Sequence, residues 1–239
     1  MLGLPDEITV ALFDLDGVLT TTAAVHQSAW KNVFDRYLAE RGDGSAPFSE
    51  RDYLDYVDGR PRLDGVRTFL ASRDIVADDD TVTAIAEDKN TEFLGVLERD
   101  GVDAYPGSVR YLEAARDAGL RIAVVTSSRN GAQVLDVAGL SKYVEHRVDG
   151  NTIVEEKLNG KPAPDSFLRG AELMGVPPAH AAVFEDAISG VQAGAAGTFG
   201  HVVGVDRVGD GSSNSAQAES MRSAGASIVV ADLADLLDK

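Results

Sequence analysis

The stretch Val10-Ala11-Leu12-Phe13-Asp14-Leu15-Asp16-Gly17 decides the fold of this chain. Its four apolar residues predict a short buried strand, which is followed at once by two carboxylates and a glycine. A buried strand has no structural use for acids at its tip, because an unpaired buried charge is costly. Open α/β sheets bind their ligands at the carboxyl ends of the strands. Asp14 and Asp16 therefore predict a site that binds a hard cation and acts on a phosphate.

Further apolar runs alternate with helical patterns along most of the chain. Their continuous hydrophobicity is typical of strands that are covered on both faces. Glycines at 139, 175 and 197 end the helical patterns between them. This alternation predicts an α/β fold with a doubly wound parallel sheet and right-handed crossovers. The expected strands are residues 10–13, 120–125, 181–184, 201–205 and 228–230.

Residues 22–100 interrupt the alternation, because they contain helical patterns and no convincing strand. We expect them to form an inserted α-helical cap domain directly after the acidic strand tip, where it would lie over the tip as a lid. The predicted division of the chain is a catalytic core of residues 1–21 and 101–239 and a cap of residues 22–100.

Composition limits the kinds of partner that the protein can have. The 239 residues carry a formal net charge of −17, which argues against nucleic acid and against anionic membrane surfaces. Any phosphate site must then be a local cluster of cations and backbone amides. No apolar stretch approaches the roughly 20 residues of a membrane helix, and Asp14 breaks the first apolar run. We therefore expect no membrane span, no signal peptide and a cytoplasmic protein.

Three more segments end in polar side chains. Val125 is followed by hydroxyls that lead into a predicted helix start, where free amides attract anions. Phe184 is followed by a second acid pair, and a lysine lies between the two segments on a loop that prolines stiffen. The side chains concerned are Thr126, Ser127, Ser128, Lys161, Glu185 and Asp186.

Each of these features alone has a plain structural explanation. An Asp-x-Asp pair is more often a turn or a surface acid, and a serine pair most often caps a helix. A single lysine is a solvated charge, and an acid pair could cap the helix that follows it. Their order along the chain, with each at the end of a strand or loop, makes a coincidence improbable.

This order is similar to the four motifs of the haloacid dehalogenase superfamily of phosphotransferases, and the match extends from Val10 to about Val205. Within the superfamily, the chain resembles the β-phosphoglucomutase branch. That resemblance rests on Asp14-Leu-Asp-Gly-Val-Leu-Thr20, on His26 four residues before Trp30, on Gly59-Arg60-Pro61-Arg62 and on Gly160-Lys-Pro-Ala-Pro-Asp165.

The resemblance implies a role for each catalytic residue. Asp14 would attack phosphorus and become an aspartyl phosphate. Asp16 would protonate the leaving oxygen and later deprotonate the incoming hydroxyl, which implies a raised pKa for its carboxyl. Lys161 and Thr126 would neutralise and orient the oxygens of the phosphoryl group in transfer.

The implied cofactor is Mg²⁺. The resemblance places it on the carboxylates of Asp14 and Asp186 and on the main-chain carbonyl of Asp16, with Glu185 bound directly or through water. Magnesium keeps several waters, so few protein ligands are enough.

A phosphomutase must also hold the far end of a bisphosphate. The resemblance places Arg62 of the cap and a group of core residues around this distal phosphate, and a guanidinium suits such a bidentate contact. His26 and Lys89 match cap positions that couple substrate binding to closure and to the seating of Asp16. The substrate-binding residues implied in this way are His26, Gly59, Arg60, Arg62, Lys89, Ser127, Ser128, Arg129 and Asn130.

The chain departs from the family pattern at three positions. Thr21 stands where an aspartate is usual, Ala187 replaces a hydroxyl residue after the acid pair, and Arg60 replaces a small apolar residue in the cap. None of these changes removes a catalytic group. Arg60 adds a positive charge near the expected distal phosphate.

Three functions stay open on the sequence alone. The first is a monomeric phosphomutase that interconverts β-D-glucose 1-phosphate and D-glucose 6-phosphate through glucose 1,6-bisphosphate. The second is a Mg²⁺-dependent sugar phosphate or small-molecule phosphatase, which would use the same acids with water as the acceptor. The third is a non-catalytic phospho-acceptor such as a signalling receiver domain, although receivers are shorter and lack the helical insert.

Overall fold

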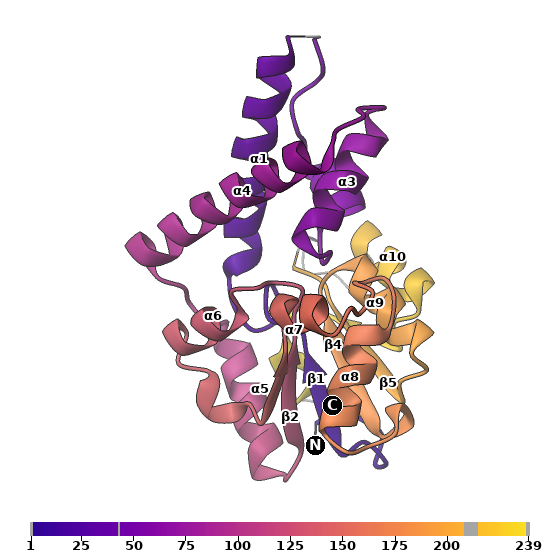
Figure 1. The fold of residues 1–239 in the computed structure, drawn as a ribbon. Helices are drawn as coiled ribbons and strands as arrows, with labels where there is room; N and C mark the ends of the chain where they lie inside the picture. The colour runs from indigo at the N-terminus through magenta and orange to yellow at the C-terminus, as the bar shows by residue number, and fades with distance from the viewer. Residues whose placement is uncertain (1, 43, 208–214, 238–239) are drawn as a thin grey trace.

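The computed structural model describes residues 2–42, 44–207 and 215–237. Within them, parallel strands form one sheet in the order β3-β2-β1-β4-β5-β6. The predicted doubly wound α/β sheet is confirmed (Figure 1). The strands are β1 Val10–Phe13, β2 Arg121–Val125, β3 His146–Val148, β4 Ala181–Glu185, β5 His201–Val205 and β6 Ile228–Val230.

Strand β1 lies at the centre of the sheet and is wholly buried. It pairs with β2 on one side and β4 on the other, so that Phe13 is in register with Val124 and with Phe184. The backbone NH of Asp14 donates to the carbonyl of Phe184, 2.9 Å away. The two acid pairs at the ends of β1 and β4 are therefore neighbours.

Helices cover both faces of the sheet because successive strand residues point to opposite sides. Phe13 and Phe184 pack against Tyr111 of α5 on one face. Val10 and Leu12 belong to the apolar cluster of the other face, together with residues of α8, α9 and α10. The core helices are α5 Pro106–Asp117, α6 Gly131–Val137, α7 Gly150–Glu155, α8 Asp165–Leu173, α9 Ile188–Ala196 and α10 Ala216–Ala224, with short 3₁₀ turns at Ser141–Tyr143, Pro178–His180 and Leu233–Leu236.

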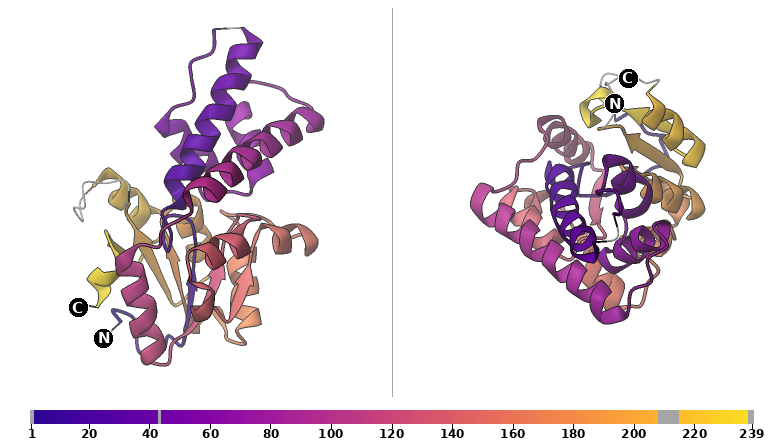
Figure 2. Two further views of the ribbon diagram at one scale, coloured as in Figure 1. Left: turned by 90° about the vertical axis from the view of Figure 1, so that its left-hand side faces the viewer. Right: turned by 90° about the horizontal axis from the view of Figure 1, so that it is seen from above.

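The segment between β1 and α5 is helical and stands over the carboxyl ends of the strands (Figures 1 and 2). It has an apolar cluster of its own, in which Phe34, Phe48 and Phe69 pack ring to ring. On this basis we propose that residues 22–100 form a separate cap domain. Its elements are α1 Thr22–Arg41, α2 Glu50–Asp52, a π-helical turn η1 Tyr53–Val57, α3 Arg62–Ser72 and α4 Asp79–Asp100.

Strand β3 is the one strand of the described sheet that the sequence did not predict. Only the last of its three residues, Val148, is buried, because β3 is an edge strand. An edge strand of this kind has no apolar run for a pattern to detect. Among the described helices, none is long and apolar enough to cross a membrane.

Candidate active site

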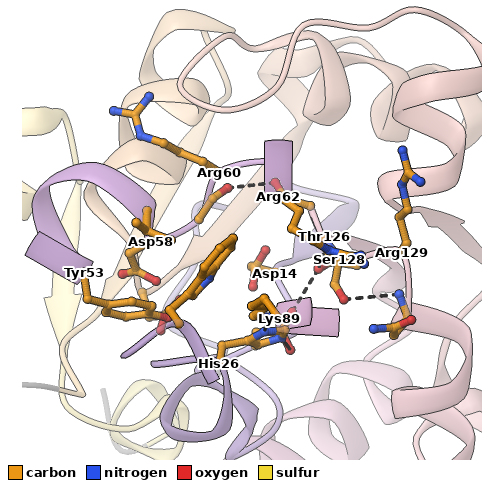
Figure 3. A pocket seen from close by; sticks show the side chains of 17 residues that line it. Asp14, His26, Tyr53, Asp58, Arg60, Arg62, Lys89, Thr126, Ser128 and Arg129 are labelled. Carbon is orange, nitrogen blue, oxygen red and sulfur yellow. Dashed lines mark hydrogen bonds and ion pairs between the residues drawn. The ribbon is translucent and has the colours of Figure 1, made fainter. Parts of the chain in front are cut away.

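A cavity lies between the cap and the carboxyl ends of β1, β2 and β4 (Figure 3). Its volume is about 70 Å³. The predicted site residues that line it are Asp14, Asp16, His26, Gly59, Arg60, Arg62, Lys89, Thr126, Ser127, Ser128, Arg129, Asn130 and Asp186. Lys161 and Glu185, the remaining two, are buried directly behind its floor.

Lys161 joins three of the predicted segments. Its Nζ donates to Oδ1 of Asp14 at 2.5 Å, to Oε1 of Glu185 at 2.5 Å and to the carbonyl of Val125 at 3.2 Å. Burial alone would lower the pKa of this lysine, but the two carboxylates outweigh burial and raise the pKa. Lys161 is therefore a permanent cation directly behind the expected nucleophile.

Glu185 is fully hydrogen-bonded in this arrangement. One of its oxygens accepts from Lys161, and the other accepts from the backbone NH of Ala187 at 2.9 Å. Gly190 of α9 makes room for this carboxylate, since a Cβ there would overlap it. Each oxygen of Glu185 therefore already has one donor.

Asp16 accepts hydrogen bonds from residues on both sides of the cavity. Thr22 donates to its Oδ1 at 2.5 Å, Nε2 of His26 lies 3.1 Å from the same oxygen, and Thr126 donates to Oδ2 at 3.1 Å. Burial raises the pKa of the Asp16 carboxyl, but His26 and the hydroxyls outweigh burial and hold the pKa below its ordinary value. The expectation of a raised pKa is wrong for this arrangement, because donors surround the charged form.

His26 connects Asp16 to the cap. Its ring stacks on Phe93 at a centroid distance of 4.1 Å, and its Nδ1 is hydrogen-bonded to Nζ of Lys89. The ionised carboxylate of Asp16 can only accept, so Nε2 carries the ring proton and Nδ1 accepts from Lys89. Burial and the neighbouring Arg62 together lower the pKa of Lys89 to about 7, although Asp16 works in the opposite direction. The predicted positions His26 and Lys89 thus form one chain of contacts that ends at Asp16.

The acids on the floor suit a divalent cation. Burial raises the pKa of Asp14 and of Asp186, and the surrounding carboxylates add to the effect in both cases. Gly17, with φ +87°, brings the turn after β1 so close to Asp186 that a Cβ would overlap its carboxylate. In the described part of the chain, no three His, Cys, Asp or Glu side chains form a ready-made metal cluster. Mg²⁺ needs no such cluster, since water supplies most of its ligands.

Positive charge gathers on the other side of the cavity. Arg62 lies at the start of α3, where burial and the neighbouring Arg129 both lower the pKa of its guanidinium. An anion bound between the two guanidinium groups would offset this repulsion. Asn130 donates to Asn90 of α4 at 2.9 Å, which ties this wall to the cap. Figure 3 shows Arg60 pointing away from both Asp14 and Arg129.

Sequence reasoning missed several residues of the cavity. Tyr53, Val57 and Asp58 of the cap line it, as does Trp30 of α1. Burial raises the pKa of the Asp58 carboxyl to about 7, although the hydroxyl of Tyr53 beside it works in the opposite direction. The only signal for Asp58 was its position directly before Gly59. No pattern marked the others, which come together through packing of the cap helices.

Known proteins resemble this chain in sequence over most of its length. A family model described as haloacid dehalogenase-like hydrolase matches residues 8–198. A beta-phosphoglucomutase of Mycobacterium tuberculosis is 52% identical over 99% of this chain and 94% of its own length. Hexitol phosphatase A of Escherichia coli is 31% identical over 83% of each chain.

Solved structures agree on the fold. A putative beta-phosphoglucomutase from Bacteroides vulgatus superimposes with a TM-score of 0.78, covering 97% of this chain and 86% of that one. Its sequence identity is 23%, so the likeness concerns the fold alone.

Proposed function

The chain belongs to the haloacid dehalogenase-like hydrolase family, and we propose that it is a phosphomutase that interconverts β-D-glucose 1-phosphate and D-glucose 6-phosphate through glucose 1,6-bisphosphate. We further propose that it works as a monomer, since one chain supplies both the acids and the arginines of the cavity.

The single observation that carries this proposal is that the cavity has two ends. Asp14 and Asp16 lie at one end, backed by Lys161. Arg62 and Arg129 lie at the other. A phosphatase needs only the first end, whereas an enzyme that passes a phosphoryl group between two positions of one sugar must hold both phosphates. A bisphosphate intermediate fits this requirement.

In the proposed transfer, a carboxylate oxygen of Asp14 forms a bond to phosphorus while the bond from phosphorus to the sugar oxygen breaks. Lys161 neutralises Asp14 in the resting state. During transfer it would stabilise the negative charge on the phosphoryl oxygens. Thr126 is close enough to Asp16 to orient it. Most of the rate enhancement would come from this positioning and charge stabilisation.

Asp16 would give a proton to the leaving sugar oxygen and take one from the incoming hydroxyl. Its low pKa in the present arrangement is set by the donors around it. A phosphoryl group beside Asp16 brings like charge, and like charge raises the pKa of a carboxyl. Substrate binding itself would therefore prepare Asp16 to act as the acid.

Mg²⁺ fits the residues present, with Asp14, Asp186 and the main-chain carbonyl of Asp16 as its proposed protein ligands. When bound, it would neutralise the charge of the transferring phosphoryl group. In the present arrangement Glu185 contributes by holding Lys161 in place.

The test is to follow β-glucose 1-phosphate with magnesium and a trace of glucose 1,6-bisphosphate. We expect glucose 6-phosphate as the dominant product, and little turnover of the α-anomer. Dominant release of inorganic phosphate would instead favour a sugar phosphate phosphatase. That second function is supported by the similarity to hexitol phosphatase A.

A further inference from the structure

The turn formed by Asp58 and Gly59 is a place where the cap is bonded to the core through consecutive carbonyls. The hydroxyl of Ser189 donates to the carbonyl of Asp58 at 2.8 Å. The hydroxyl of Ser127 donates to the carbonyl of Gly59 at 2.7 Å. The two serines come from different walls of the site, since Ser127 follows β2 and Ser189 lies in the first turn of α9.

Gly59 fits this contact more closely than any other residue could. Its φ is +71°, which L side chains rarely adopt. A Cβ on Gly59 would also overlap the hydroxyl of Ser189 and lie 2.9 Å from the Cβ of Ala187. Both neighbours are buried. Backbone conformation and available space therefore select glycine independently.

The bonded turn lies beside the reacting groups. Asp58 and Gly59 line the cavity that contains Asp14 and Asp186, and Ser189 follows Asp186 by three residues. The chain passes between core and cap at two crossings, which lie elsewhere. These crossings pair with each other at Thr20 and Ala104. The two hydrogen bonds therefore join cap and core at a place apart from these crossings.

We propose that Ser189 is a positioning residue that fixes the closed cap and so favours a sugar hydroxyl over water as the phosphoryl acceptor. This inference rests on the phosphomutase function proposed above. When the cap lifts, water reaches phosphorylated Asp14. The water oxygen then bonds to phosphorus, the bond from phosphorus to Asp14 breaks, and Asp16 takes the water proton, so that inorganic phosphate is released. A hydroxyl that stabilises the closed cap suppresses this loss.

The test compares two products of one enzyme. Wild type and Ser189→Ala are given β-glucose 1-phosphate, magnesium and a trace of bisphosphate, and the ratio of inorganic phosphate to glucose 6-phosphate is measured. The loss of one such hydrogen bond should raise this ratio by about three- to tenfold. A residue with a merely structural role would lower both products together and leave the ratio unchanged.

Further variants separate the contact from its surroundings. Ser189→Thr keeps the hydroxyl and should restore the wild-type ratio. Ser220→Ala removes an exposed hydroxyl that bonds within α10 and should change nothing. Gly59→Ala disrupts the same contact from the cap side, because its Cβ would overlap the hydroxyl of Ser189. It should raise the ratio at least as far as Ser189→Ala does. A folded Gly59→Ala enzyme therefore tests the contact independently.

The outcomes are distinguishable. A wild-type enzyme that makes only inorganic phosphate would refute the proposed function itself. A wild-type enzyme that makes glucose 6-phosphate efficiently, with an unchanged ratio in both Ser189→Ala and Gly59→Ala, would refute the role of Ser189 and leave the proposed function intact.

Discussion

The Nζ atom of Lys161 lies 2.5 Å from Oδ1 of Asp14, and none of the lysine side chain is exposed. This pair joins the end of β1 to the loop before α8. The same ammonium lies 2.5 Å from Glu185 at the end of β4. One cation therefore holds together three segments that are far apart in the sequence, at the point where the phosphoryl group would be transferred.

Replacing Lys161 by methionine should lower kcat by at least about 100-fold, because it removes a charge that stabilises the transferring phosphoryl group. Breaking a buried ion pair from one side should also cost about 3–5 kcal/mol of unfolding free energy. Steady-state kinetics and denaturant unfolding measure the two effects. Lys142→Met, which removes an exposed lysine, is the control and should behave as wild type. Activity near wild type in Lys161→Met would contradict the role of this residue.

Arg62→Ala should distinguish binding of the distal phosphate from transfer of the phosphoryl group at Asp14. Loss of a charged hydrogen-bond donor to the distal phosphate should lower mutase flux by roughly 10- to 150-fold. Hydrolysis of a simple aryl phosphate, which has no second phosphate, should change little. Arg67→Ala on the same helix removes an arginine that pairs with Asp79 and serves as the control. Equal losses on both substrates would show that Arg62 does not bind the distal phosphate.

The sequence predicted most of the sheet and the floor of the site, because these parts carry local signals. A strand such as Val10–Phe13, buried on both faces, must be apolar throughout. The acids after it interrupt that pattern at the place where ligands bind. Strand β3 lies at the edge with two exposed residues and carried no such signal.

The cap side of the site was harder to predict, for a physical reason. Tyr53, Asp58 and Asn90 reach the cavity or its rim through the packing of helices against one another. Nothing in the spacing along one helix reveals which residues of another helix it will meet. The hydrogen bonding of Glu185 also depends on a residue distant in the sequence, since its partner Lys161 lies 24 positions earlier in the chain.

The buried charge of Lys89 predicts a pH dependence of stability. Burial lowers the pKa of Lys89 from 10.5 in the unfolded chain to about 7. Between these values the unfolded chain binds a proton that the folded protein lacks, so this lysine makes stability rise with pH. Lys89→Met removes this contribution. The unfolding free energy of Lys89→Met minus that of wild type should be greatest near pH 7 and should decrease as the pH approaches 10.5.

Unfolding free energies of both proteins at several pH values between these limits measure this difference. The same series with Lys142→Met should give a difference from wild type that stays flat. A flat difference for Lys89→Met would show that Lys89 keeps its charge in the folded protein throughout the range.

Magnesium should stabilise the protein as well as activate it. A cation that binds only the folded state raises the melting temperature, and here it would relieve the repulsion between Asp14 and Asp186. A chelator should therefore lower both turnover and Tm, and Asp186→Asn should lose most of the Tm shift. Asp55→Asn, which removes a carboxylate paired with Arg51, should keep it. Full turnover in the presence of a chelator would exclude a metal role.

The most direct measurement is to find the residue that carries the phosphoryl group. The protein is incubated with radiolabelled glucose 1,6-bisphosphate, quenched in acid and digested, and the labelled peptide is sequenced by mass spectrometry. We expect an alkali-labile phosphate on Asp14, which forms within one turnover and is absent from Asp14→Asn. Label on Asp16 or on a hydroxyl, or turnover of the wild-type protein without any labelled peptide, would contradict Asp14 as the nucleophile.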